Sequence, residues 1–329
     1  MTEPTPAAPA ANRLMTLPMI VRTTTVGQRE VAGRAGRDRR PRTTMSQFAP
    51  SDDRADPVAL LAEQEVIRTP QLLPLRHARM SVSPVTFYRG GAGIMTADLA
   101  SMPNSGLVTQ LCGDAHLSNF GMFAAPDRSV IFDINDFDET NPGPFEWDVL
   151  RLAASFVLAG RDLGLQQDTI AEAAAAAGSA YRGQMRMYAG MTDLAVWYDR
   201  VSVDVLAGWA SAQGDPRAQR IIARSAGKAR SRDAWSAVTK LTEIVDGQRR
   251  FRDLPPLLMR IPLTTHSRHR STTSSSNTAP PCPVTGSPCS ANTRSATSGT
   301  RLWVLAVWVS SHSSSCLRAE MKMTSLCCR

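Results

Sequence analysis

The feature that most constrains this chain of 329 residues is an acid-rich stretch that runs from Cys112 to Asp148. The stretch is otherwise apolar and contains glycines, yet it gathers polar side chains at Asp114, His116, Asn119, Asp133, Asp136, Asp138, Glu139 and Asp148. Carboxylates this close together repel one another unless a cation, backbone N–H groups or a proton offsets their charge. A divalent metal ion is the simplest such cation, so the stretch predicts a metal site.

Hydrophobic patterning places these side chains at the ends of two short strands. Residues 107–112 are patterned as a buried strand, which Gly113-Asp114 breaks into a loop. Residues 129–135 alternate as a second strand, so Asp133 and Asp136 follow near its end. We therefore expect two strand ends to present oxygen ligands to one point. A set of loop-forming Asp and Asn residues without a site is the alternative.

The spacing Asp114-x-x-x-x-Asn119, followed by Asp136-Phe137, is typical of phosphoryl-transfer enzymes. In such enzymes an Asp orients the substrate hydroxyl or accepts its proton, while an Asn and a second Asp bind Mg²⁺. Residues 113–119 resemble the GDxHxxN catalytic loop of aminoglycoside-phosphotransferase-like kinases, and residues 134–138 resemble their metal-binding Asp-Phe segment. Residues 146–153 resemble the Asp-Leu-Ala helix start that supports this loop.

The kinase resemblance implies a role for each residue of the loop. Asp114 is the expected base or hydroxyl-orienting residue, and His116 is the second catalytic candidate, with a loop-ordering histidine as the alternative. Asn119 is an expected Mg²⁺ ligand together with Asp136 or Asp133, between which the sequence does not decide.

At the scale of the whole domain, the chain resembles the bacterial domain of unknown function 2252 family. Its phrases occur here as LRHARM at 75–80, FYRGGA at 87–92 and PGPFEWD at 142–148. The resemblance covers roughly residues 27–261 and implies no settled activity. The kinase resemblance, in turn, implies that Asp148 supports the loop, and a helix N-cap is the alternative.

Residues 87–93 (FYRGGAG) are predicted to form a short strand followed by a glycine turn. Backbone N–H groups in such a turn can approach an anion, and Arg89 is a candidate ligand for a cofactor phosphate. A tight turn with a salt-bridged arginine is the alternative.

Charge is distributed unevenly along the chain. The net charge is +8, but residues 254–329 hold eight of the 37 basic residues and only one of the 29 acidic residues. The rest is nearly neutral, so the basic run of residues 34–42 is expected to be a solvated arm, and nucleic acid is not expected as a partner.

With a lone cysteine before the tail, no membrane-spanning run and no signal peptide, we expect a cytoplasmic protein without a membrane partner.

The composition changes abruptly near residue 261, after which Asp, Phe and Tyr no longer occur. Tryptophan has a single codon. When the codons are read in the shifted frame, Trp303 and Trp308, each followed by a valine, must therefore each give a glycine. Permitted codons elsewhere give a glycine-rich segment like one in the family. We therefore predict a frameshift near residues 261–266 and the loss of a phosphate-binding glycine loop.

The expected fold is α+β: an incomplete protein-kinase-like fold with a small sheet that carries the acidic loops, packed on a mainly helical lobe. Residues 1–26 are expected to be disordered, 27–261 to form the partial domain, and 262–329 to be an out-of-frame, disordered tail. The leading hypothesis is a truncated phosphotransferase, inactive as written, that uses Mg²⁺ and, only in an intact full-length form, ATP. A metal-dependent hydrolase and a non-catalytic metal-binding module are the alternatives. The substrate, a small molecule or a nucleotide, and the oligomeric state stay open.

Overall fold

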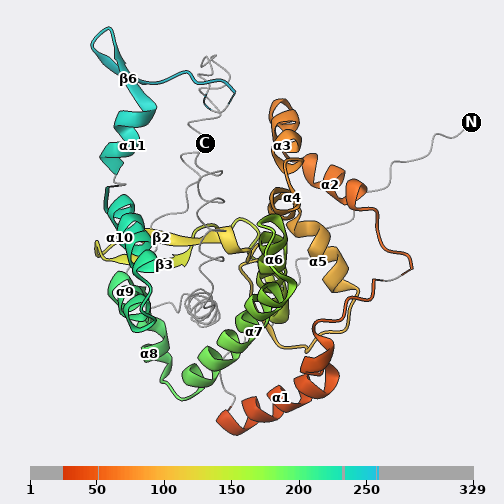
Figure 1. Cartoon of the computed structure of the whole chain (residues 1–329). Helices are drawn as coiled ribbons and strands as arrows, with labels where there is room; N and C mark the ends of the chain where they lie inside the picture. Colours follow the sequence, from red (N-terminus) through yellow and green to blue (C-terminus); the bar gives the residue numbers. More distant parts are fainter. Residues whose placement is uncertain (1–24, 51, 232–233, 257, 259–329) are drawn as a thin grey trace, which may run out of the picture.

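The structure is a computed structural model that describes residues 25–50, 52–231, 234–256 and 258 (Figure 1). These residues form many helices and three small antiparallel sheets, so the predicted α+β class is confirmed. Disorder was expected for residues 1–26, of which 1–24 lie outside the described residues, as does the expected out-of-frame tail at 262–329. Thr25 and Val26 are ordered, because Thr25 caps the first described helix and Val26 starts it.

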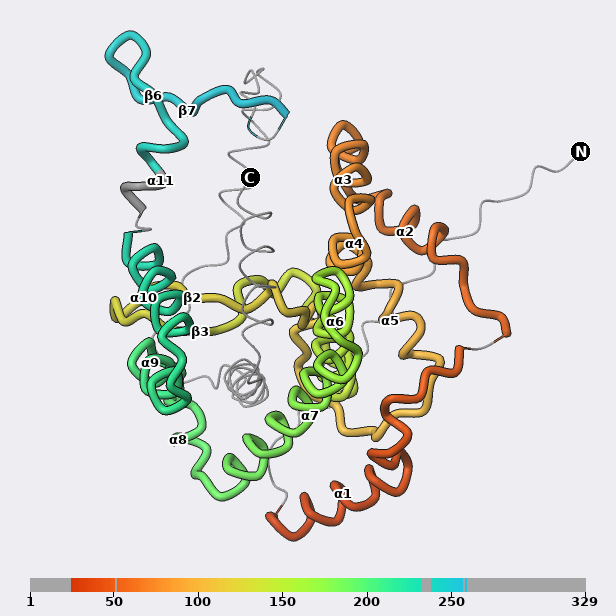
Figure 2. Tube along the Cα trace, in the orientation of Figure 1, coloured from red at the N-terminus to blue at the C-terminus, as the bar shows by residue number. Residues whose placement is uncertain are grey.

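Two long helices, α6 (Glu146–Asp162) and α7 (Gln167–Ala189), pack against each other in the middle of the domain (Figure 2). They approach closely at Gly160, where an added Cβ would lie 2.6 Å from Cγ1 of Ile170. The sequence suggests a capping box that starts the second helix at Thr169. That prediction is wrong, because the chain turns at Gly164 with a φ of +67° and the helix is already formed at Gln167.

A three-stranded sheet carries the acidic region, with strand order β2–β3–β5. Strand β2 (Phe120–Ala124) pairs with β3 (Val130–Ile134), and β3 pairs with the short β5 (Val201–Ser202). Helices α9 (Val203–Ala212) and α10 (Pro216–Ser231) pack against this sheet (Figure 1). The core joins the sheet to α6 and to α9 and α10 through buried apolar side chains, among them Phe120, Phe132, Leu152, Phe156, Leu206 and Ile222.

A second, two-stranded sheet brings the start of α6 to the acidic loop. Strand β1 (Val108–Gln110) pairs with β4 (Pro142–Pro144), which directly precedes α6. Two further backbone hydrogen bonds extend the pairing, from Leu111 N–H to the Asn141 carbonyl and from Phe145 N–H to the Leu107 carbonyl. The loop after β1 therefore begins beside the first turn of α6.

Among the described residues, five α-helices precede β1: α1 (Val26–Arg39), α2 (Pro57–Glu65), α3 (Leu73–Met80), α4 (Pro84–Gly90) and α5 (Ala92–Ala100). The glycine-bearing segment predicted as a strand and turn is instead the end of α4 and the start of α5. A capping box between Ser83 and Thr86, with Pro84 in the first turn, starts a helix there and explains the error.

The basic run is also not a solvated arm. Residues 34–39 belong to α1, and Nε of Arg39 donates to the Ser105 carbonyl at 2.8 Å. Arg40 follows the helix and donates from Nη1 to the Pro103 carbonyl. Two arginines of this run therefore bind α1 to the segment that leads into β1.

The remaining described elements are α8 (Asp193–Tyr198), α11 (Ala234–Leu241), β6 (Thr242–Val245), β7 (Gln248–Phe251) and the 3-10 turns at Arg42–Thr44, Pro70–Leu72 and Leu117–Asn119. The sequence predicts one helix over 234–245, but the chain leaves the helix at Leu241 and forms a hairpin. Asp246 and Gly247 both have positive φ, as a two-residue hairpin turn requires, and the Asp-Gly pair is its signal. No described helix is both long and apolar enough to cross a membrane.

Candidate functional site

Asp148 fixes the backbone of the loop that follows β1. Its two carboxylate oxygens accept hydrogen bonds from the N–H groups of Cys112, at 2.7 Å, and Gly113, at 3.1 Å. Helix α6 begins at Glu146, so Asp148 lies inside its first turn and does not act as an N-cap. Burial raises the pKa of Asp148 to about 6, although the two N–H donors act in the opposite direction. The loop therefore starts from a fixed position on α6.

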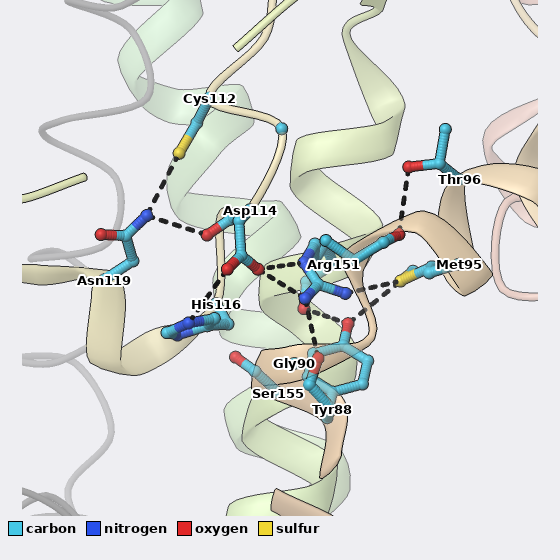
Figure 3. Close-up of polar contacts among 12 residues, drawn as sticks. Tyr88, Gly90, Met95, Thr96, Cys112, Asp114, His116, Asn119, Arg151 and Ser155 are labelled. Carbon is cyan, nitrogen blue, oxygen red and sulfur yellow. Dashed lines mark hydrogen bonds and ion pairs between the residues drawn. The ribbon is translucent and has the colours of Figure 1, made fainter. Parts of the chain in front are cut away.

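The next carboxylate of the loop, Asp114, lies between two basic side chains (Figure 3). Its Oδ1 lies 2.6 Å from Nε and 2.5 Å from Nη2 of Arg151, and its Oδ2 lies 3.3 Å from Nε2 of His116. Burial favours the protonated acid, but the bonds and charges of His116 and Arg151 outweigh it, so the pKa of Asp114 lies below its usual value. Asp114 is therefore an ionised carboxylate in a largely buried site.

Arg151 is the residue of the site that the sequence reasoning missed. Its side chain is buried, its Nη2 donates to the Tyr88 carbonyl at 2.9 Å, and its guanidinium stacks over the Tyr88 ring at 4.3 Å from the centroid. The Tyr88 hydroxyl donates in return to the Arg151 carbonyl at 2.7 Å. The available signal was the spacing of Asp148 and Arg151, which at three residues apart lie on one face of a helix.

Asn119 ties the loop to the segment that follows β3. Its Nδ2 donates to the carbonyls of Asp114 and Asp136, both at 3.0 Å. Figure 3 shows its amide oxygen pointing away from the Asp114 loop. The amide nitrogen thus bridges the two acidic segments through their backbones.

His116 is buried, and its ring contacts Asp114 through one nitrogen only. Its Nδ1 is buried with no hydrogen-bond partner among the described residues. A buried ring nitrogen without a partner is uncommon, because leaving it unsatisfied costs free energy. His116 therefore leaves one polar atom uncommitted beside the Asp114 carboxylate.

The other acidic residues surround the loop without closing on one point. Asp133 is buried at the end of β3, where its Oδ1 accepts from the Ile134 N–H at 2.8 Å. Asp136 is exposed, and its Oδ1 accepts from the Asp138 N–H at 3.1 Å. Burial, and then the charges of Asp114, Asp136 and Asp138, raise the pKa of Glu139. The acids are thus near enough to repel one another.

This arrangement does not fit a divalent metal ion as it stands. Among the described residues, no group of three or more His, Cys, Asp or Glu side chains is placed to hold a metal ion. Mg²⁺ demands near-octahedral oxygen ligands. Of the predicted ligands, Asp133 and Asp136 each accept a neighbouring backbone N–H, and Asn119 directs its amide nitrogen to the loop. The expectation that both strand ends present oxygens to one point is therefore not met by these side chains. Ligation of Mg²⁺ by Asn119 with Asp133 or Asp136 stays a prediction.

Arg89 belongs to a different local structure from the one that the sequence suggests. It lies in the last turn of α4, on an exposed helical surface, and not in a glycine turn that follows a strand. Binding of a cofactor phosphate by Arg89 also stays a prediction.

The sequence from 68 to 281 matches a family described as an uncharacterized protein conserved in bacteria, DUF2252. The chain belongs to this family. The match includes the whole site, from Tyr88 in α4 to Arg151 in α6, and confirms the family predicted from the sequence. It also extends past residue 261, into the segment predicted to be out of frame. No curated protein matches the chain. No solved structure matches it either.

Proposed function

We propose that this DUF2252 chain is a truncated member of a kinase-like phosphotransferase family, and that Asp114 orients the hydroxyl group of a small-molecule substrate. The observation that carries the proposal is the Asp114 carboxylate, ionised between Arg151 and His116 on a loop whose start is bound to Asp148. Transfer of a phosphoryl group depends mainly on positioning and electrostatics, and a fixed carboxylate supplies positioning.

The two oxygens of Asp114 are not equivalent in this arrangement. Oδ1 is engaged by two nitrogens of Arg151, whereas Oδ2 has the single, longer contact with His116. A substrate hydroxyl would therefore donate to Oδ2, and Arg151 would hold the carboxylate in one orientation. A carboxylate with a lowered pKa orients the hydroxyl well and takes up its proton only late in the transfer.

The nucleotide-binding part of the site would be supplied by a segment that an intact protein has and this chain lacks. The predicted frameshift removes a glycine-rich loop of the kind that binds phosphates, so we expect the chain as written to bind no ATP and to be inactive. If Mg²⁺ is required, it would neutralise charge on the phosphoryl group, and no step here depends on its position.

A non-catalytic binding module is the second candidate, and one observation favours it. Arg151 already neutralises Asp114 in a buried pair, which is what a purely structural carboxylate would need. A metal-dependent hydrolase is supported less, because it needs a metal-activated water and no described group of side chains is placed to hold the metal.

The test is an assay of ATP consumption on the protein with its reading frame restored near codon 261, combined with calorimetric titration of ATP in the presence of Mg²⁺. We expect saturable ATP binding, and we expect Asp114→Asn to lower turnover by about 10²-fold or more while binding persists. Asp162→Asn, at an exposed aspartate near the end of α6, is the matched control and should retain full turnover. Absence of ATP binding by the restored protein would refute the phosphotransferase and leave the binding module.

A further inference from the structure

A cavity of about 860 Å³ is lined by residues of α1, of the start of β1 and of the pair α6–α7. Apolar side chains form much of its wall, including Leu107, Phe145, Val149 and Tyr181. The volume is that of a site for a small organic molecule, and such sites are mostly apolar with a few placed polar groups.

The entrance of the cavity is basic. Arg37 and Arg42 reach it from α1 and the turn that follows, and Arg182 and Arg186 reach it from α7. All four are exposed, and none makes an ion pair within the part of the chain that the structure describes. The four charges favour an anion at this entrance.

A fifth arginine, Arg40, lines the cavity from inside the fold. It is only 5% exposed, and one terminal nitrogen, Nη1, donates to the Pro103 carbonyl. The other, Nη2, is buried and has no hydrogen-bond partner among the described residues. A buried guanidinium N–H without an acceptor is costly, and a carboxylate or phosphate is its natural partner.

Two carboxylates also line the cavity, but both have other hydrogen-bond partners. Glu146 accepts from the Ser105 N–H and hydroxyl, at 2.5 and 2.9 Å. Asp148 accepts from the loop amides described above. Five arginines against two engaged carboxylates leave the cavity positively charged overall.

We propose that this cavity binds a small organic anion, with its apolar body against the wall and its carboxylate or phosphate beside Arg40 and the other arginines that line the cavity. The proposal is independent of phosphoryl transfer at Asp114, because Asp114, His116 and Arg151 are not among the residues that line this cavity.

The test is calorimetric titration of the full chain with 1-naphthyl phosphate, 1-naphthoate and the uncharged 1-naphthol. We expect both anions to bind with one-to-one stoichiometry and the alcohol to bind at least about tenfold more weakly. The anion that binds with the higher affinity then indicates whether the ligand of the cavity carries a phosphate or a carboxylate. Equal affinity for the alcohol, or no saturable binding of either anion, would overturn the proposal.

Gly178 provides a variant that blocks the cavity without threatening the fold. It lies on α7 and lines the cavity, and a Cβ added there meets no atom within 4 Å. Gly178→Leu fills the space while leucine favours a helix more than glycine does. We expect at least about a tenfold loss of anion binding, and unchanged binding would contradict the proposed location. The control is Gly183→Leu, on the same helix and equally open but outside the cavity.

Arginine variants test the charge. Arg40→Gln should abolish the preference for the anions over 1-naphthol, and Arg186→Gln should weaken anion binding severalfold at low salt. Arg220→Gln, at an exposed arginine on α10, is the matched control. Asp114→Asn should leave binding unchanged, which separates this site from the proposed phosphotransferase. If Arg186→Gln and Arg220→Gln behave alike, the basic entrance does not bind the anion.

Discussion

The carboxylate of Asp114 and the guanidinium of Arg151 form a buried ion pair, although the two residues lie 37 positions apart in the chain. The pair joins the loop after β1 to α6, and Tyr88 joins α4 to the same arginine. Three segments from different parts of the sequence therefore depend on one side chain.

The first prediction concerns that pair. Arg151→Met should lower the free energy of unfolding by about 3–5 kcal/mol, because it leaves the Asp114 charge buried without its partner. In the double variant Asp114→Asn/Arg151→Met the charge is gone, so the loss should be clearly smaller than the sum of the two single losses. Urea unfolding of the four proteins measures the coupling, and strictly additive losses would contradict it.

The second prediction concerns the pH dependence of stability. The folded protein raises the pKa of Asp148 from 3.8 to about 6, so it holds this proton more tightly than the unfolded chain does. The contribution of Asp148 is therefore fully present below about pH 4 and is lost as the pH rises to about 6, a change on the order of 3 kcal/mol.

Urea unfolding of wild type and Asp148→Asn between pH 3 and 7 isolates this effect from the other titrating groups. The difference in stability between wild type and variant should fall as the pH rises through this range. A difference that is constant with pH would mean that Asp148 ionises normally in the folded protein.

The third prediction concerns the contact between α6 and α7. Gly160→Ala should destabilise the domain by about 1–3 kcal/mol, since the new methyl group would lie 2.6 Å from Cγ1 of Ile170. Gly183→Ala, on α7 with open space around it, should stabilise by about 1 kcal/mol through helix propensity alone. Thermal unfolding of the two variants should therefore shift in opposite directions, and a shared direction would argue against close packing at Gly160.

The fourth prediction separates the two roles considered for Asn119. If its amide nitrogen bridges the carbonyls of Asp114 and Asp136, Asn119→Asp should destabilise at least as much as Asn119→Ala, by about 1–3 kcal/mol. The aspartate keeps a metal-ligating oxygen but loses both N–H donors and faces two carbonyls. Stability of Asn119→Asp equal to wild type would instead favour a role as an oxygen ligand only.

Much of the region around the loop could be predicted from sequence because its signals are local. The alternation of residues 129–135 identified β3. Strand β2 carried no such signal, because Phe120–Ala124 has a glycine and no polar alternation. Its pairing with β3 supplies the structure that its own sequence does not specify.

The partners of the site residues could not be predicted, because they are set by contacts between distant segments. The acidic stretch suggested a metal ion as the source of positive charge, whereas the structure supplies Arg151 from α6 next to Asp114. An arginine on an amphipathic helix usually faces solvent, so the spacing from Asp148 was the sequence signal that set Arg151 apart from Arg161. The prediction of a strand and turn over residues 87–93 was wrong because it gave the glycines more weight than the helix-starting capping box at Ser83.

Asp148 takes part in two sites: it accepts hydrogen bonds from the backbone amides that begin the acidic loop, and it lines the arginine-rich cavity. A substitution at this position would disturb both and could assign an effect to neither. Mutations that separate the two sites must therefore be made elsewhere, at Arg151 for the acidic loop and at Gly178 for the cavity.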